Sequence, residues 1–519
     1  MMKKQLGIVG IIFLSIGSCF AGNPDSTRVT DVIDRSLQRE EYHLIFDKVP
    51  SLLSVWEKGD YALISTGFSS SGGDYVHPQL FFSKNLFEIK SESVKSLPVN
   101  GWRFFGSVAY TNGNAETGKW NMSYNLPTNG SPYYYMIEQE GTWKSQSYDF
   151  NVAAQKNISG RLSAGIGLKY LGDLHFRTFD SRNDNTTLKI QVLPSLTINL
   201  DGKNYISIGL LYQRLKNEPN ISNKYQHGTE PEKYHLFFNQ GLGTWDNSPS
   251  QMRMIDSRYG ALISYRKFSA NSSFDAIYAI DYGSEEWLLK SLSTLNNRRE
   301  DISRYNYFSH DLSLRHRSVT SSGSFVTNFD IKNILGDGAV YKESTNAYQD
   351  NYQFFSITAD LDVSYIRSNS VLRQLSAKLR LDNSSQNDYN YGHILEYTNL
   401  EGTLSADVIS GKKRAVNLIF GGLFSYKMNL SGNHNPMAAS SNFFNTEIAI
   451  PAFAYHTSDF YRAGARVSSE FDIAGGYRLD ISLSGDFLKP IKLNNYENRS
   501  SFTLNDKYYL MSLSLCFNF

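Results

Sequence analysis

The most regular feature of the sequence is an alternation of apolar and polar residues that recurs along its whole length. In residues 355–365 every second position is apolar, and these positions are Phe355, Ile357, Ala359, Leu361, Val363 and Tyr365. A period of two places one kind of residue on each face of a β-strand. Similar patterns occupy residues 162–170, 461–473 and 477–487. The sequence therefore predicts a protein built from many strands.

A further alternating segment lies at the C-terminal end of the chain and ends in aromatic residues. Tyr509, Met511, Leu513, Leu515 and Phe517 alternate with mostly small or polar residues, and the chain ends at Phe519. An apolar outer face with a terminal aromatic residue is typical of the closing strand of a bacterial outer-membrane β-barrel. The barrel-insertion machinery of that membrane recognises its substrates at this strand. The last strand of a soluble β-sandwich is the alternative, because it alternates in the same way.

The N-terminal residues predict export from the cytoplasm. A short basic start is followed by an apolar run over residues 6–16 and then by small residues up to Ala21. This order predicts a secretory signal peptide over residues 1–21. A lipid-attachment site at residues 16–19, with Cys19 as the lipidated residue, is the alternative. After Ala21 no window reaches the roughly 18 apolar residues that a helical membrane span needs.

Composition changes this picture little, but it excludes some classes of protein. A chain of 519 residues would ordinarily form several domains, yet 34 Tyr, 32 Phe and 38 Gly are spread evenly and no linker interrupts them. The net charge of +1 gives no sign of nucleic-acid binding. Of the two cysteines, Cys19 lies in the predicted signal peptide, so no disulfide can form within the mature chain.

The polar faces of the predicted strands distinguish a barrel from a sandwich. They are rich in Gly, Ser, Asn and Asp with scattered arginines, as expected of a confined aqueous lumen. We predict an antiparallel transmembrane β-barrel over residues 59–519, with about 18 strands (roughly 16–20), because bacterial single-chain barrels have even strand numbers. Residues 22–58 would form an N-terminal lead, either a small plug in the lumen or a periplasmic extension.

The connections between the strands predict the orientation of the barrel. Short turns at residues 157–160, 201–202 and 474–476 are expected to face the periplasm. Long connections are expected at the cell exterior, over residues 113–146, 216–252, 284–304 and 335–351.

Three segments resemble a known family. They are residues 120–135, which read Trp-Asn-Met-Ser-Tyr-Asn-Leu-Pro-Thr-Asn-Gly-Ser-Pro-Tyr-Tyr-Tyr, residues 179–185, and the end of the chain at Phe519. Together they are similar to an uncharacterised family of outer-membrane β-barrels from Bacteroidota, a domain of unknown function. The resemblance covers essentially the whole mature chain and implies the barrel fold, but no activity and no functional residue. Members look like companions of TonB-dependent receptors, which hints at a role in uptake.

Two function classes are disfavoured by the residues themselves. A TonB-dependent receptor needs a plug of more than about a hundred residues and a barrel of about 22 strands. The lead predicted here, residues 22–58, is much shorter than such a plug. An enzyme needs a catalytic constellation, yet no Gly-x-Ser-x-Gly motif occurs and the histidines are scattered. His310 and His316 lie on the apolar phase of one strand, and His227 and His235 share a long connection without metal-ligand spacing. We therefore expect no enzyme, no cofactor and no metal site.

The charged residues of the late strands are the first set of candidate functional residues. If their polar faces point inward, they place opposite charges on the wall of the lumen, and such strips orient polar solutes at a constriction. The alternative is that these charges neutralise one another as an ion-paired wall. The candidates are Asp360, Asp362, Lys378, Arg380, Arg462, Arg466, Glu470, Asp472, Arg478 and Asp480.

Two functions remain open at this point. One is a channel or accessory component of solute or nutrient uptake in the Gram-negative outer membrane. The other is a closed docking or structural barrel that binds a surface lipoprotein or a TonB-dependent receptor through aromatic residues of its loops, since large aromatics dominate interfaces. Those candidates are Trp120, Tyr133, Tyr134, Tyr135 and Trp245, and mutual packing of the loops over the barrel mouth is their alternative role. Membrane lipid and the barrel-insertion machinery are the other expected partners, and nucleic acid is not expected.

Overall fold

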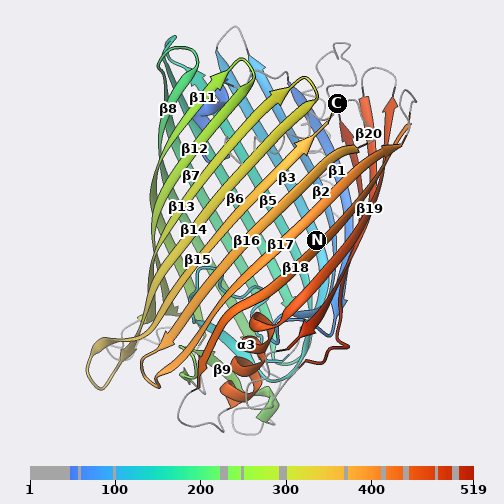
Figure 1. The fold of residues 1–519 in the computed structure, drawn as a ribbon. Coiled ribbons are helices and arrows are strands. Elements are labelled where there is room, and N and C mark those ends of the chain that lie inside the picture. The colour runs from blue at the N-terminus through green and yellow to red at the C-terminus, as the bar shows by residue number, and fades with distance from the viewer. Residues whose placement is uncertain are drawn as a thin grey trace, which may run out of the picture.

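A closed β-barrel accounts for most of the chain (Figure 1). The computed structural model describes residues 47–55, 60–97, 101–117, 119–222, 232–246, 251–290, 301–367, 372–410, 416–436, 443–473, 477–493 and 502–518. The predicted signal peptide, residues 22–46 of the lead, His227 and Phe519 lie outside these ranges. Within them, eighteen antiparallel strands form one barrel, which confirms the predicted fold and its central strand number.

The barrel strands follow one another in chain order around the wall. They are β1 (Tyr61–Gly73), β2 (Phe81–Leu97), β3 (Trp102–Thr117), β5 (Gly141–Asn157), β6 (Leu162–Arg177), β7 (Arg182–Asn199), β8 (Asn204–Ser222), β11 (Met252–Ser269), β12 (Ser272–Leu289), β13 (Asp301–Thr320), β14 (Gly323–Lys342), β15 (Ala347–Ile366), β16 (Leu372–Asp388), β17 (His393–Ser410), β18 (Val416–Asn435), β19 (Asp459–Ile473), β20 (Tyr477–Lys492) and β21 (Tyr508–Asn518). Each strand pairs with its neighbours, and β1 pairs with both β2 and β21, which closes the sheet.

The two faces of the wall meet different surroundings. On β21, Met511 and Leu513 point outward and are 59% and 47% exposed, whereas Ser512 points inward and shares a hydrogen bond of 2.7 Å with Ser484 of β20. Large exposed apolar residues recur in this phase around the barrel, for example Ile208 and Leu404. Such an apolar outer band is the surface that a membrane-spanning barrel presents to lipid. Among the described residues, no helix is long and apolar enough to cross a membrane.

The connections fall into two sets at opposite ends of the barrel. The end at which the chain enters β1 has short turns, such as residues 200–203 between β7 and β8. The opposite end has the long connections over residues 118–140, 223–251 and 290–300, each shorter than expected because the strands extend further. The predicted long connection over residues 335–351 is wrong, because β14 and β15 are separated only by residues 343–346. The expected turn at residues 474–476 lies outside the described residues.

Small elements gather at the end with long connections (Figure 1). The strands β4 (Tyr134–Ile137), β9 (Leu236–Asn239) and β10 (Trp245–Asp246) form a separate three-stranded sheet, and η4 (Glu232–Tyr234) precedes β9. Between β18 and β19, η5 (Phe444–Ala449) leads without a break into α3 (Ile450–Thr457), and Pro451 lies near the junction of the two. The strand pattern of the sequence gives no sign of these helices. A further short helix, η2 (Pro50–Val55), precedes β1.

A charge on the outer face of the closing strand should destabilise the barrel. Leu513→Arg is expected to lower the free energy of unfolding by about 2–4 kcal/mol, because an arginine near the middle of the lipid-facing band loses its hydration. Ser514→Arg is the matched control, since its side chain faces the wet lumen from the next position. Denaturant titration of both variants in lipid, followed by tryptophan fluorescence, measures the difference. Equal losses in the two variants would contradict the assignment of faces.

Candidate functional site in the lumen

The predicted charged residues line a cavity inside the barrel, which we call the inner cavity. It has a volume of about 760 Å³ and is walled by β14 to β21. Of the ten candidates, Asp362, Lys378, Arg466, Glu470 and Asp480 line it directly. Asp360 and Arg380 lie opposite each other in register on β15 and β16, and the side chain of Asp472 lies outside the described side chains.

Most of these charges are in ion pairs. Lys378 and Asp360 are 3.2 Å apart, and Arg466 and Asp407 are 2.5 Å apart. Arg462 pairs with Asp486. Asp362 instead accepts a hydrogen bond of 3.2 Å from the Ser364 hydroxyl. The structure thus brings the candidates together as a neutralised wall, the arrangement that was the alternative to opposed strips of charge.

The most extended network ties four strands together at the short-turn end. Glu470 of β19 accepts hydrogen bonds from Arg373 of β16 at 2.8 Å and from Arg478 of β20 at 2.5 Å. Arg478 also contacts Asp480 at 3.1 Å, and Asn518 of β21 donates to Asp480 at 2.8 Å. Because the chain of contacts reaches β21, it braces the region where the barrel closes. Arg373 was not a candidate from the sequence, since nothing in the strand pattern shows that it reaches across two intervening strands.

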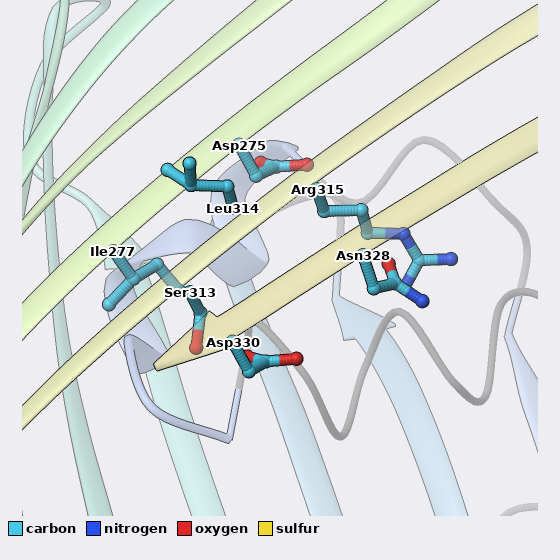
Figure 2. Close-up of a pocket in the computed structure, with 7 residues that line it drawn as sticks. All are labelled: Asp275, Ile277, Ser313, Leu314, Arg315, Asn328 and Asp330. Atoms are coloured by element: carbon cyan, nitrogen blue, oxygen red, sulfur yellow. The ribbon is translucent and has the colours of Figure 1, made fainter. Parts of the chain in front are cut away.

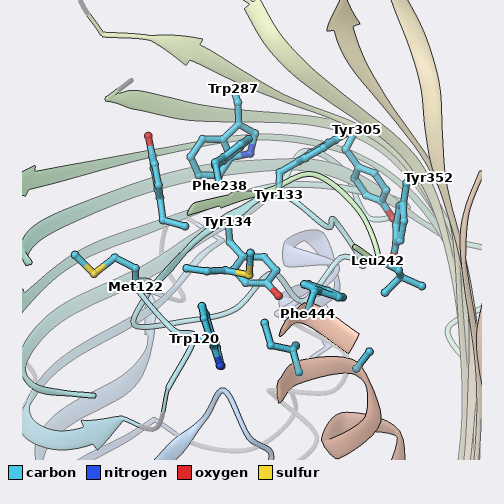
Figure 3. Close-up of a cluster of buried hydrophobic side chains, with 14 of the residues drawn as sticks. Trp120, Met122, Tyr133, Tyr134, Phe238, Leu242, Trp287, Tyr305, Tyr352 and Phe444 are labelled. Carbon is cyan, nitrogen blue, oxygen red and sulfur yellow. The ribbon is translucent and has the colours of Figure 1, made fainter. Parts of the chain in front are cut away.

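The aromatic loop residues fill the opposite end of the lumen (Figure 3). Trp120, Tyr133, Tyr134 and Tyr135 are all buried, and they pack with wall residues such as Trp287, Tyr305 and Tyr352. Trp245 is half-buried and its ring lies 4.8 Å from that of Phe443. We call this cluster the aromatic core. Four of the five predicted loop anchors are therefore placed for packing inside the mouth and present no surface to a partner outside it.

Hydrogen bonds fix the aromatic core to the wall. The Tyr133 hydroxyl donates to Asn351 at 3.1 Å, and the backbone amide of Met252 donates to the Tyr135 hydroxyl at 3.0 Å. Gln79 donates to the Tyr134 hydroxyl at 3.0 Å, and burial raises the pKa of Tyr134 to about 12. The hydroxyls are therefore neutral at physiological pH and satisfied, as buried polar groups need to be.

Two cavities adjoin the aromatic core. The larger, the central cavity, has a volume of about 1050 Å³ and charged residues in its walls, including Lys84, Asp173, Lys189, Asp256 and Lys332. The smaller, the side cavity, has a volume of about 360 Å³ and is lined mainly by β15 to β17, η5, α3 and the loops. With about 30 Å³ per water molecule, the central cavity alone has room for a few tens of waters. This part of the lumen is therefore wet and large enough for a small polar solute.

A segment of the lead lies inside the barrel at the short-turn end. Residues 47–55, which we call the inner segment, contact separate parts of the wall: Asp47 pairs with Lys169 of β6 at 2.5 Å, and Lys48 with Asp311 of β13, five strands further round the barrel, at 3.2 Å. The Ser51 hydroxyl lies 2.7 Å from that of Thr197. The apolar residues of the segment pack on inward-facing wall residues, and this cluster contains Val49, Leu52, Leu53, Val94, Phe105, Ala153 and Ile277. The sequence left open whether the lead lies in the lumen or extends into the periplasm. Its described part, the inner segment, lies in the lumen.

A small pocket lies in the wall beside the inner segment, lined by residues of β12, β13 and β14 (Figure 2). Among Asp275, Ser313, Arg315, Asn328 and Asp330 it has a volume of about 20 Å³, which is room for about one water molecule. On β6, Gly165 faces the segment, and a Cβ atom there would clash with the backbone of Pro50 and Ser51. In the sequence, the inward glycines at 165 and 167 are the signal of this contact, which was not predicted.

Removal of the Glu470 carboxylate, which Arg373 and Arg478 share, should destabilise the barrel. Glu470→Gln is expected to lower the free energy of unfolding by about 3 kcal/mol, because two largely buried arginines lose their charged partner. Asp407→Asn is the control, since its partner Arg466 is 47% exposed and an exposed pair contributes about 0–1 kcal/mol. Denaturant unfolding of the refolded variants measures both values. Similar losses in the two variants would contradict a stabilising role for the network around Glu470.

Comparisons with known proteins give several similar structures and one matching family. The chain is similar to the FrpB iron transporter from Neisseria meningitidis (9% identity, 91% of this chain and 83% of that chain, TM-score 0.45). It is also similar to FyuA, the ferric yersiniabactin uptake receptor from Yersinia pestis (8%, 89% and 80%, 0.42), and to OccK5 from Pseudomonas aeruginosa (9%, 89% and 98%, 0.36). No curated protein matches the chain. The sequence profile of a family of unknown function, DUF6850, matches residues 50–510, and the chain therefore belongs to that family.

Proposed function

We propose that this protein is an outer-membrane channel for polar solutes, serving solute or nutrient uptake, whose lumen its own chain keeps closed at rest. The observation that carries the proposal is the pair of large polar cavities, about 1050 and 760 Å³, inside a wall that faces lipid. A barrel with a purely structural role has no need of wet internal space of this size, since solid packing of the lumen is more stable.

The two obstructions in the lumen support a gated channel. One is formed by the loop residues of the aromatic core, such as Trp120, Tyr133 and Tyr135, and the other is the inner segment of the lead. Neither set of residues belongs to the hydrogen-bonded wall of the barrel, so each can move without breaking the barrel. Loops and termini are the parts of a fold from which such movable closures are drawn.

The setting of the channel is part of the proposal. The exposed apolar band supports insertion into lipid, and we assign the protein to the outer membrane of a Gram-negative bacterium, of the Bacteroidota by the resemblance of its sequence. Its closing strand would be recognised by the barrel-insertion machinery through Phe519. A TonB-dependent receptor or a surface lipoprotein remains a candidate partner in uptake, although the buried aromatic core removes the surface by which docking was first expected. The proposed activity is passage without catalysis.

Displacement of the inner segment should enlarge the conductance. In planar bilayers we expect larger single-channel currents from a form lacking residues 22–58 than from the mature chain, because the segment occupies part of the lumen. Gly165→Val should have the same effect with the lead intact, since its side chain displaces Pro50 and Ser51. Gly106→Val is the matched control, because a Cβ there meets nothing within 4 Å.

A reversible lock separates a gate from a general loss of structure. In a Cys516→Ser background, Ser51→Cys with Thr197→Cys joins the segment to β7, since the two hydroxyls lie 2.7 Å apart. Oxidation should hold the current at its small level, and reduction should release it. Silence of every form, the deletion included, would contradict a channel and favour a filled barrel.

A further inference from the structure

The wall between the central cavity and the side cavity contains two histidines. His77, on the connection between β1 and β2, and His456, in α3, each line both cavities. Their ring centroids are 5.5 Å apart, with 58° between the ring planes. Leu126, Pro127, Thr128 and Tyr134 also line both cavities, so the two imidazoles form part of the wall that the cavities share.

Each imidazole is anchored by the structure around it. The His456 ring stacks on Tyr397, with centroids 4.6 Å apart and planes 7° from parallel, and its backbone carbonyl accepts a hydrogen bond of 2.5 Å from Lys427. The loop of His77 is fixed through Gln79, whose side chain donates to the Trp120 carbonyl at 2.9 Å and whose carbonyl accepts from Asn121 at 2.6 Å. Both rings are held in place before any ligand arrives, a property of built sites.

The ring nitrogens are available for coordination. Within the described part of the chain, neither nitrogen of His456 has a hydrogen-bond partner, and His77 engages only Nδ1, which accepts from the Gln79 amide at 3.3 Å. Burial lowers the pKa of His77 to about 4 and that of His456 well below its usual range. Both rings are therefore neutral at pH 7, the form that binds metal. Coordination by Nε2 of His77 places the ring proton on Nδ1 and gives up only that long hydrogen bond.

The separation of the rings fits one shared ion. A metal–nitrogen distance of about 2.0–2.1 Å and a nitrogen about 1.1 Å from its ring centroid put two imidazoles on one ion with centroids about 4.4 Å apart at a cis square-planar angle and about 5.1 Å apart at a tetrahedral angle. The observed 5.5 Å lies just above this range, so a small movement of either ring lets both bind one ion. Imidazole favours divalent ions such as Cu²⁺, Ni²⁺ and Zn²⁺.

We propose that His77 and His456 form a transit site for a divalent transition-metal ion, free or carried by a small chelator, in the wall shared by the two lumen cavities. Among the described residues no group of three or more His, Cys, Asp or Glu side chains is arranged to hold a metal. The remaining positions on the ion belong to water or to the chelator. Two protein ligands suit passage, because a site in a pore binds strongly enough to admit an ion and weakly enough to release it. This inference names a solute class for the channel proposed above. Metal binding does not depend on that function, whereas the movement of the ion through the site rests on it.

Copper binding by the untagged, refolded mature chain tests the site. At pH 7, calorimetry should give one Cu²⁺ per chain, and electron paramagnetic resonance should show two coordinating imidazole nitrogens. His77→Gln and His456→Gln should each weaken binding by at least about 10-fold, the effect that loss of even a supporting hydrogen bond has at a metal site. His310→Gln is the control, because His310 faces outward from β13 and bonds Tyr278.

The outcomes separate the site from the channel. The shift in electrophoretic mobility between heated and unheated samples shows whether each variant is folded, so loss of binding in a folded variant is specific to the ligand. Absence of binding by the mature chain, unchanged affinity in the double variant or a spectrum with a single nitrogen would overturn the metal site and leave the conductance measurements untouched. Silent bilayers with intact copper binding would overturn the channel and leave the site.

Discussion

The seam between β1 and β21 is the constraint on which the rest of the molecule depends. Backbone groups without hydrogen-bond partners in lipid cost several kcal/mol each, so a sheet in a membrane has to close. Eleven residue pairs do so here, from Leu63 opposite Asn518 to Gly73 opposite Tyr508. Once the ring is closed, every strand has one face toward lipid and one toward the lumen. The network around Glu470 reaches β21 from the inside, so it reinforces the same seam.

Closure at eighteen strands creates the second problem, which is the width of the lumen. Side chains from the wall fill the interior of a barrel of about eight strands but not of one this wide. The chain fills part of the remainder with tyrosines that lie along the wall: Tyr305 and Tyr307 occupy the space over Gly336 and Gly283, where a Cβ would meet their rings. Loops and the lead fill more, and the remainder is cavity. Closure thus sets the width of the lumen, and the chain leaves part of that width unfilled as cavity.

The fold was predictable from the sequence because two solvents act on every strand separately. Lipid on one side and water on the other impose the period of two locally, as in residues 355–365, so no long-range information was needed. The prediction of a long connection over residues 335–351 was wrong because the alternation is interrupted there. Gly336 and Gly338 face inward on β14 to make room for tyrosine rings, which erased the alternation and made the end of the strand look like a loop.

The candidate site was less predictable, since it depends on which strands become neighbours across the lumen. Arg373 meets Glu470 from β16 to β19, and His77 meets His456 from segments that are hundreds of residues apart in sequence. The aromatic residues at 133–135 were recognised as unusual, but a sequence cannot say whether a loop folds inward or outward. The helices at 444–457 have no polar face to reveal them, because they pack among loops and wall.

The two closures rest on different parts of the wall, and this arrangement determines how they act together. The aromatic core is bonded to β11, β12, β13 and β15, for example through Glu285, which accepts from Ser131 at 2.7 Å, and through Tyr305, which donates to the Asn129 carbonyl at 2.9 Å. The inner segment is bonded to β3, β5, β6, β7 and β13 at the other end. No described residue belongs to both apolar clusters, so release of one closure leaves the contacts of the other intact. In the proposed channel, two independent closures would shut the lumen on at least one side unless both opened together. A solute would then enter the lumen before its release, without a continuous leak across the membrane.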